Sequence, residues 1–206
     1  MIDLQEHYAN HDEDGTPEYC RVCHPEMQTQ DREYLTCAET AKLVRAALKR
    51  EFPGVKFSVR SDTYSMGASI RVRWTNGPTQ SNVQAVTNQY AGGRFDSMID
   101  LAYGAEHWLT PDGRAILHRT YGHSYASENV TLEHRTAPKG SRLVHFGANY
   151  VFADRDLSPE FTAELWAEIA VKFGYPTEYD EMYRLPNGGY AGELVWRASQ
   201  EEGKDG

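Results

Sequence analysis

Two short runs in which apolar and polar side chains alternate constrain the fold of this chain more than any other feature. Residues 55–60 are apolar at every second position, and residues 70–74 repeat the pattern with arginine between the apolar positions. A period of two predicts strands with one buried and one exposed face. The segment between them, 61–69, is polar and contains glycine, so we expect the two strands to pair as an antiparallel hairpin.

Helix signals flank this hairpin. Thr36 and Glu39 have the spacing of a capping box, in which each side chain accepts a hydrogen bond from a free backbone N–H group at the helix start. Apolar residues then recur at helical spacing from Ala41 to Leu48, and Pro53-Gly54 ends the run. A second apolar stripe at helical spacing follows in residues 83–90. The predicted core is therefore helix–hairpin–helix (α-β-β-α).

The remainder of the chain predicts further antiparallel strands and a carboxy-terminal helix. The strands are expected at 105–109, 114–121, 129–136 and 142–152. Residues 110–113 (Thr-Pro-Asp-Gly) predict a turn between the first two. The helix should begin after Ser158, which is followed by proline and glutamate, and end at Gly174. The turn sequence at 186–189 predicts a last hairpin, and the fold class is α+β.

The composition is that of an ordinary globular protein. The 206 residues are 40% hydrophobic and 25% charged, which fits one domain with a small appendage. No apolar run approaches the ~18 residues of a membrane span, and three cysteines exclude a disulfide-stapled secreted scaffold. We expect a cytoplasmic protein without membrane contact. Its predicted parts are an amino-terminal element at 1–33, an α+β domain at 34–200 and a frayed tail at 201–206.

Histidine and cysteine gather in the polar amino-terminal element. His7, His11, Cys20 and Cys23 are spaced H-x3-H-x8-C-x2-C and offer one Zn²⁺ ion two nitrogen and two sulfur donors. The segment has too few aliphatic side chains to order itself by burial, so metal binding would supply its folding free energy. The sequence therefore predicts a structural zinc site in residues 1–33.

Alternatives to this ligand set stay open. His24 is an alternate ligand beside Cys23, and Cys37 would replace either histidine. The string Cys20-x2-Cys23-His24 also spells the c-type haem attachment motif. That interpretation requires export, and the first residues carry no export signal.

The net charge of −9 is distributed unevenly. Residues 1–34 hold nine acids and two bases (−7), residues 41–75 hold eight bases and two acids (+6), and residues 153–206 hold twelve acids and five bases (−7). The field of the whole chain repels nucleic acid, so any attraction to it has to come from a local patch.

The predicted patch is the exposed face of the hairpin. Its basic side chains, at polar positions of the two strands, are Lys56, Arg60, Arg71 and Arg73. Clustered lysine and arginine bind phosphates, and Tyr64 and Tyr90 would stack on bases. An acidic protein would fit the same face. In a further alternative, the two acidic segments occupy a partner's phosphate-binding groove.

Two His-x-Thr motifs supply an enzymatic alternative. His118/Thr120 and His134/Thr136 would face each other if residues 115–121 and 129–136 pair as a hairpin. Paired His-x-Thr motifs are the signature of two-histidine phosphoesterases, in which one histidine acts as base and the other as acid. In those enzymes the motifs lie much further apart in a duplicated fold, and this chain shows no duplication. The alternative function is hydrolysis of a phosphodiester or nucleotide.

One stretch of the chain resembles a known family. The motifs are Thr36–Arg45, Phe52–Arg60, Ser69–Trp74, Gly77–Thr79 and Gly92–Asp96, in this order. Together they are similar to the large polyvalent protein-associated domain 29 (LPD29) over residues 34–103. The resemblance implies an accessory protein of phages or mobile elements, with roles in countering host defence or supporting the entry of foreign DNA. It implies no catalytic residues. We therefore expect a non-enzymatic protein that binds a host macromolecule, either nucleic acid or a defence protein.

Overall fold

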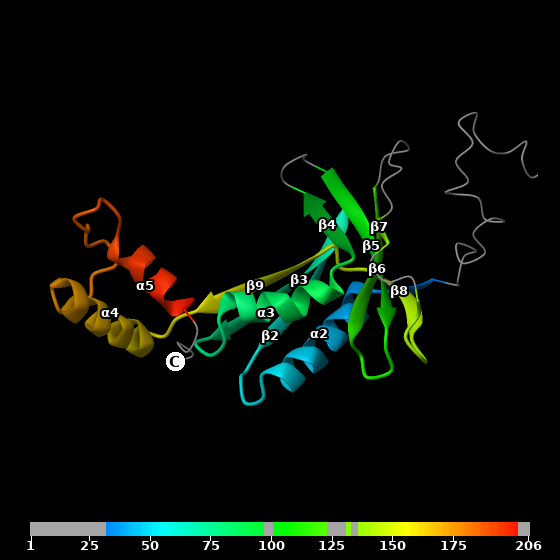
Figure 1. Cartoon of the computed structure of the whole chain (residues 1–206), viewed down its shortest axis with the longest axis horizontal. Helices are drawn as coiled ribbons and strands as arrows, with labels where there is room; N and C mark the ends of the chain where they lie inside the picture. The colour runs from blue at the N-terminus through cyan, green and yellow to red at the C-terminus, as the bar shows by residue number, and fades with distance from the viewer. Residues whose placement is uncertain (1–31, 97–100, 123–130, 133–135, 202–206) are drawn as a thin grey trace, which may run out of the picture.

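The computed structural model describes residues 32–96, 101–122, 131–132 and 136–201. Within these ranges the chain forms four α-helices, a short 3-10 helix and two mixed β-sheets (Figure 1). The helices are α2 (Cys37–Glu51), α3 (Gln80–Thr87), η3 (Asn88–Tyr90), α4 (Pro159–Phe173) and α5 (Ala191–Ser199). The strands are β1 (Glu33–Leu35), β2 (Ser58–Tyr64), β3 (Gly67–Thr75), β4 (Gly93–Asp96), β5 (Leu101–Leu109), β6 (Ala115–Gly122), β7 (Thr131–Leu132), β8 (Arg142–Phe146) and β9 (Tyr150–Asp156). The α+β class is confirmed.

The predicted order helix–strand–strand–helix is present as α2, β2, β3 and α3. These four elements do not form a unit by themselves. Helix α2 begins with the capping box of Thr36 and Glu39, and β2 pairs antiparallel with β3. The other edge of β3 pairs with β9, more than 70 residues later, and this pairing is parallel. Strands β1 and β8 also pair in parallel. The expectation that all added strands are antiparallel was therefore wrong, and the helix–hairpin–helix is part of a larger sheet system.

The larger sheet has the order β1-β8-β5-β6-β7, and β4 pairs with the first half of β5. The predicted single strand at 142–152 is in fact two strands that belong to different sheets, β8 and β9. The chain changes sheet at Gly147–Asn149, where its backbone hydrogen-bonds to three other segments: Gly147 N–H donates to Leu35 O, Asn149 N–H to Ala68 O, and Ala148 O accepts from Gly92 N–H.

Two glycines let this crossing pack tightly. A Cβ atom on Gly92 would lie 1.9 Å from the carbonyl oxygen of Phe146, and one on Gly147 would lie 2.6 Å from Leu35 O. Such distances exclude any side chain unless the backbone moves. Gly92 and Gly147 therefore permit the backbones to meet at this crossing.

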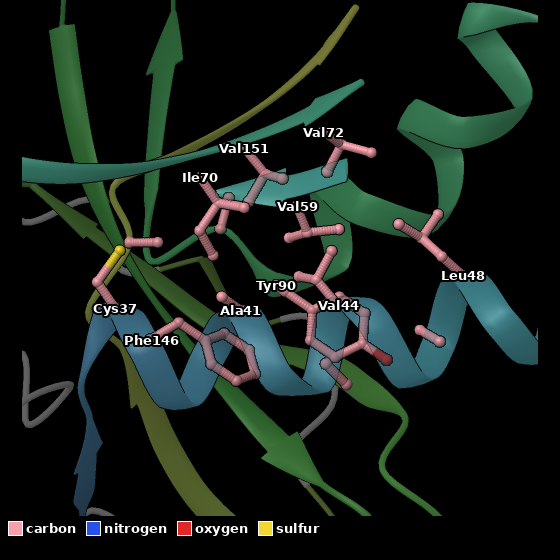
Figure 2. Packing of buried hydrophobic residues seen from close by; sticks show 14 of the residues in the cluster. Cys37, Ala41, Val44, Leu48, Val59, Ile70, Val72, Tyr90, Phe146 and Val151 are labelled. Atoms are coloured by element: carbon pink, nitrogen blue, oxygen red, sulfur yellow. The ribbon is translucent and has the colours of Figure 1, made fainter. Parts of the chain in front are cut away.

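One hydrophobic core joins α2 to both sheets. Ala41, Val44 and Leu48 of α2 are almost completely buried (Figure 2). They belong to one cluster with the inward-facing residues of β2, β3 and β9 and with Val144 and Phe146 of the larger sheet. Because this cluster spans both sheets, the two sheets and α2 pack as one body within the described residues.

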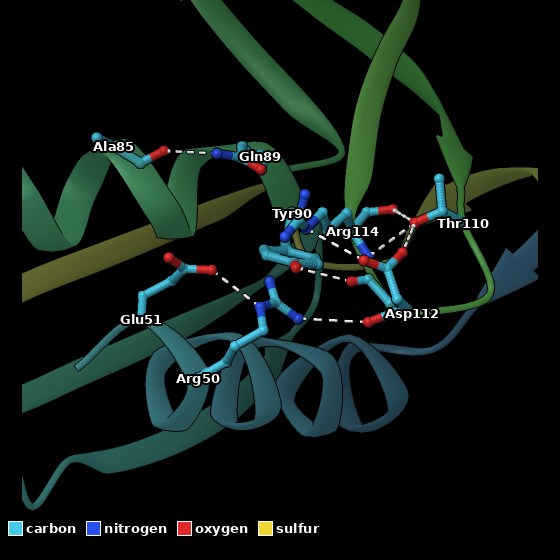
Figure 3. A network of polar contacts seen from close by, with 9 residues as sticks. Arg50, Glu51, Ala85, Gln89, Tyr90, Thr110, Asp112 and Arg114 are labelled. Atoms are coloured by element: carbon cyan, nitrogen blue, oxygen red, sulfur yellow. Dashed lines mark hydrogen bonds and ion pairs between the residues drawn. The ribbon is translucent and has the colours of Figure 1, made fainter. Parts of the chain in front are cut away.

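A polar network ties the carboxyl end of α2 to the turn between β5 and β6 (Figure 3). The Tyr90 hydroxyl donates to Gly113 O at 2.8 Å, and Arg50 Nη1 donates to Asp112 O at 3.3 Å. Thr110 N–H donates to Arg114 O at 2.9 Å. Gly113 has a φ of +81°, which glycine adopts readily, so the predicted turn is confirmed.

Helices α4 and α5 have a hydrophobic cluster of their own, centred on Trp166. Ser158 caps α4, and Gly174 ends it with a φ of +71°, as the sequence predicts. The expected hairpin at the end of the chain was wrong. The turn near Gly188 forms, but only a single bridge between Arg184 and Tyr190 precedes α5. The reason is that Ala191, Val195 and Ser199 recur at helical spacing and are buried.

Buried Arg155 joins this helical unit to the sheet domain. Only 4% of the residue is exposed. Its guanidinium donates to the carbonyl oxygens of Asn76, Gly77 and Ser199, and it lies 5.7 Å from the centre of the Phe161 ring. Within the described ranges, no helix has the length and apolar character that a membrane crossing requires.

Candidate functional site

An arginine-lined pocket of about 200 Å³ lies on the smaller sheet. Its lining residues, which we call the arginine pocket, are Ser58, Arg60, Arg71 and Arg73. They come from β2 and β3, and all four are exposed. The pocket is smaller than the ~300–1,000 Å³ of typical sites for drug-sized ligands. It therefore suits a small charged group better than a whole organic ligand.

Strand register brings these side chains together. In the antiparallel pair, Ser58 lies opposite Arg73, and Arg60 lies opposite Arg71. Side chains directly opposite each other point to the same face of a sheet. Val59 and Val72, at the alternate positions, are buried in the core beneath α2. The alternation seen in the sequence thus places three guanidinium groups on one face.

The parallel neighbour β9 adds an acid and an aromatic ring to this face. Arg71 lies opposite Phe152, and Arg73 lies opposite Asp154. Arg71 Nη1 is 3.0 Å from Asp154 Oδ2, and Arg73 Nε is 3.7 Å from the same oxygen. The Arg71 guanidinium also lies 5.8 Å from the centre of the Phe152 ring. One carboxylate thus neutralises part of the charge of two arginines.

The side chain of Arg60 makes no hydrogen bond or ion pair with any other residue that the structure describes. With Arg71 and Arg73 it leaves the arginine pocket a net charge of +2 once Asp154 is counted. Lys56 is exposed but precedes β2 and does not line the pocket. Three of the four predicted basic residues are therefore brought together, and the fourth is not.

The two tyrosines proposed for base stacking have different environments. Tyr64 is 50% exposed at the end of β2. Tyr90 is 1% exposed, and its hydroxyl donates to a backbone carbonyl. Burial raises the pKa of the Tyr90 hydroxyl, and the nearby Arg50 only partly offsets this. Tyr90 is a core residue, and assigning it to base stacking was wrong.

Sequence reasoning missed three residues of this face. Ser58 is an uncharged polar position of the first strand, so the search for basic side chains does not select it. Phe152 and Asp154 lie more than 75 residues after the hairpin. The sequence of 150–156 does not alternate, because its first four residues are apolar and the buried Arg155 lies between two acids, and no local signal shows that β9 pairs with β3. That pairing is a long-range contact and needs the tertiary structure.

The first His-x-Thr motif lies on β6, at an irregularity of the sheet. Glu106 pairs with Arg119 and His107 pairs with Leu117, so His118 is an extra residue in the ladder. The ring centre of His118 lies 4.7 Å from that of Trp108. Strand β7 pairs antiparallel with β6, with Thr120 opposite Thr131. Of the second motif, His134 lies outside the described residues, and Thr136 is exposed.

A buried charge cluster lies in the same part of the larger sheet. The Glu106 carboxylate, 1% exposed, accepts hydrogen bonds from Arg32 at 2.8 Å and from Arg119 at 2.6 Å. Burial alone would raise the pKa of Glu106, but the two guanidinium groups outweigh it and hold the pKa below its ordinary value. The sequence offered no signal for this cluster, because its members come from three separate segments.

Next to Glu106, His107 is completely buried. Neither ring nitrogen has a hydrogen-bond partner among the described residues. Its ring packs at 5.0 Å from that of Phe146. Burial, assisted by the positive charge of Arg94, lowers the pKa of His107 to about 3. His107 is therefore a neutral core residue at physiological pH.

The predicted zinc ligands His7, His11, Cys20, Cys23 and the alternate ligand His24 lie outside the described residues. Among the residues described, no cluster of three or more histidine, cysteine or acidic side chains is arranged to hold a metal ion. The third cysteine, Cys37, is buried at the start of α2, and its thiol lies 3.5 Å from Ser69 O. Burial raises the pKa of this thiol, which disfavours the thiolate that zinc requires.

A second hollow, about 350 Å³ in volume, lies between α4 and α5. Apolar side chains such as Leu165, Ile169 and Leu194 line it, and two acids and two bases surround it. The mixed charge gives no preference for a cation or an anion. The arginine pocket is thus the described site with a clear chemical preference.

These features define an α+β domain with an arginine-lined sheet face and a helical extension. A family model for the large polyvalent protein associated domain 29 (LPD29) matches residues 35–158. The match covers more than half of the chain, and the protein belongs to this family, whose domains are typical of phage and mobile-element proteins.

The match extends well beyond the expected 34–103, because it includes β5 to β9, which complete both sheets. Helices α4 and α5 lie outside it. No curated protein and no solved structure matches the chain.

Proposed function

We propose that this protein binds the phosphate backbone of nucleic acid through the arginine pocket. The observation that carries the proposal is the convergence of three guanidinium groups and one serine hydroxyl on an exposed sheet face. Arginine presents a planar set of N–H donors that matches phosphate oxygens in a bidentate geometry. A serine hydroxyl adds a neutral donor. The proposed role is binding rather than catalysis.

The charge of the protein supports a local contact and not an extended one. The chain carries a net charge of −9, which repels a polyanion at long range. The same sheet face also bears acids at its borders, Asp62 and Asp156. We therefore expect a small number of phosphate contacts. Each contact to a single strand contributes about 0.7 to the slope of log K against log salt concentration.

The family supports a nucleic-acid partner, because the proteins that carry this domain belong to elements that move as DNA. An acidic surface of a host defence protein is the competing partner, since a carboxylate also fits an arginine fork. The two partners differ in a measurable way. If nucleic acid is the partner, the purified protein should bind a purified oligonucleotide. If a defence protein is the partner, that partner is absent from such an assay, and no binding should be seen.

The test measures the binding of a fluorescently labelled oligonucleotide by fluorescence anisotropy. The salt concentration is about 50 mM, the lower end of the range in which salt effects on such complexes are usually compared. The double variant Arg60→Gln/Arg71→Gln should weaken binding at least tenfold and reduce the salt dependence. Lys49→Gln is the matched control, because Lys49 is exposed on α2 in the other layer of the domain. Undetectable binding by the wild type would refute the proposal, as would an equal loss in both variants.

We also propose that His7, His11, Cys20 and Cys23 hold a structural Zn²⁺ ion, with His24 as the alternate ligand. The donor set supports this proposal, because two thiolates and two imidazoles suit tetrahedral zinc. The buried and protonated state of Cys37 supports the two amino-terminal cysteines as the sulfur donors. Metal analysis of reduced protein should give about one zinc per chain, since one such donor set holds one ion. Cys20→Ser/Cys23→Ser should lose it, and zinc-free wild-type protein would refute the proposal.

A further inference from the structure

We infer that the nucleic acid bound at the arginine pocket is single-stranded and that its bases stack on Phe152 and Tyr150 of β9. The inference rests on the proposed function and specifies its ligand. Phosphate chemistry alone does not distinguish single strands from duplexes. The distinction comes from the aromatic rings beside the pocket.

The two rings lie on the same face as the arginines. Val151 and Ala153 of β9 are 6% and 2% exposed and belong to the core, so Tyr150 and Phe152 point the other way. Phe152 is 44% exposed, although it is a large apolar side chain in the middle of a strand. The ring centres of Tyr150 and Phe152 are 6.1 Å apart, and their planes differ by 32°. The face thus presents two neighbouring aromatic rings.

Arg71 links the rings to the pocket. Its guanidinium lines the arginine pocket and also lies 5.8 Å from the centre of the Phe152 ring. Adjacent strands of a sheet are about 4.8 Å apart. A phosphate held between β2 and β3 and a base placed over β9 therefore fall within the reach of one or two neighbouring nucleotides. The backbone would follow the arginines, and the bases would lie toward β9.

A duplex does not satisfy this arrangement. Within a duplex both faces of each base are covered by the neighbouring bases, so a ring on a protein surface meets only edges and phosphates. Stacking on an exposed sheet face requires bases that are already unstacked, as in a single strand. Stacking accepts any base because every base has an aromatic face. The expected ligand is therefore single-stranded DNA or RNA with little sequence preference.

The test compares a labelled single strand of mixed sequence with the duplex of the same sequence. Phe152→Ala should weaken binding of the single strand by about 5- to 150-fold, the range expected for the loss of one stacked base. Phe152→Tyr, which keeps an aromatic ring, should bind like the wild type. Phe95→Ala is the matched control, since Phe95 is 53% exposed on β4 of the other sheet. Circular dichroism and the urea unfolding midpoint establish that each variant is folded.

The outcomes separate the two proposals. If single strands bind more tightly than duplexes and Phe152→Ala lowers affinity while Phe95→Ala does not, the inference holds. If duplexes bind at least as tightly, or if Phe152→Ala has no effect while Arg60→Gln/Arg71→Gln does, the stacking inference is overturned and phosphate binding stands. If neither form binds, both proposals are overturned.

Discussion

Buried His107 should make the folding stability of this protein fall as the pH drops below about 6.5, the ordinary pKa of histidine. In the folded protein the pKa of His107 is lowered to about 3, because burial disfavours the charged imidazolium. Between these two values the unfolded chain binds a proton that the folded chain does not. The contribution of His107 to folding stability is therefore fully present above the ordinary histidine pKa. It is lost progressively as the pH falls toward the pKa of His107 in the folded protein.

The magnitude follows from the distance between the assay pH and the ordinary pKa. At pH 5, about 1.5 units below that pKa, the free energy of unfolding should be lower than at pH 7.5 by about 2 kcal/mol, at about 1.36 kcal/mol per unit. The exact pKa of His107 in the folded protein has little influence on this difference, because pH 5 is well above that pKa. The carboxylate of Glu106 contributes little in this range, since its pKa lies below the ordinary value.

The decisive variant is His107→Leu, which replaces the imidazole with a side chain that does not titrate. It should lose less stability than the wild type between pH 7.5 and pH 5, by about 2 kcal/mol. At pH 7.5 it should be at least as stable, because two buried nitrogens without hydrogen bonds are removed. Urea unfolding followed by circular dichroism measures both values.

A control variant tests whether the effect belongs to this residue. Val83→Ala removes buried side-chain atoms that do not titrate, on α3. It should keep the pH dependence of the wild type. The reasoning fails if His107→Leu loses as much stability at pH 5 as the wild-type protein does.

Three further predictions follow from particular contacts. Asp154→Asn frees two arginines of the pocket and should tighten oligonucleotide binding severalfold in the anisotropy assay. It should cost less than about 1 kcal/mol of stability, because the ion pairs are exposed. Weaker binding would contradict this prediction. Gly92→Ala should destabilise the domain by about 1–3 kcal/mol or more in urea unfolding, because the added Cβ would overlap Phe146 O. An unchanged unfolding midpoint would count against the close approach of Gly92 to Phe146. Arg155→Met leaves three carbonyl groups without their donor and should cost about 3 kcal/mol or more of stability. The effect should be detectable as an early loss of protection of α4 and α5 from hydrogen exchange. Unaltered protection of these helices would show that Arg155 does not join the two units.

The sequence alone determined those features that depend on local chemistry. The capping box of Thr36 and Glu39, the capped start of α4 at Ser158 and the turn at Gly113 are set by neighbouring residues, and all three form as predicted. The alternation in β2 and β3 also indicated which side chains share a face. It placed Arg60, Arg71 and Arg73 together, because side chains in strands alternate with a period of two.

Only the tertiary structure decided the features that join distant segments. The break between β8 and β9, the parallel pairing of β9 with β3 and the burial of Tyr90 all depend on contacts between segments far apart in the chain. These contacts bring Phe152 and Asp154 to the arginine pocket. Strand alternation shows which residues are exposed but not which strands are neighbours, because pairing is fixed by the burial of a shared core. The chain thus encodes the charge of the site locally, and the packing around α2 supplies its acid and its aromatic rings.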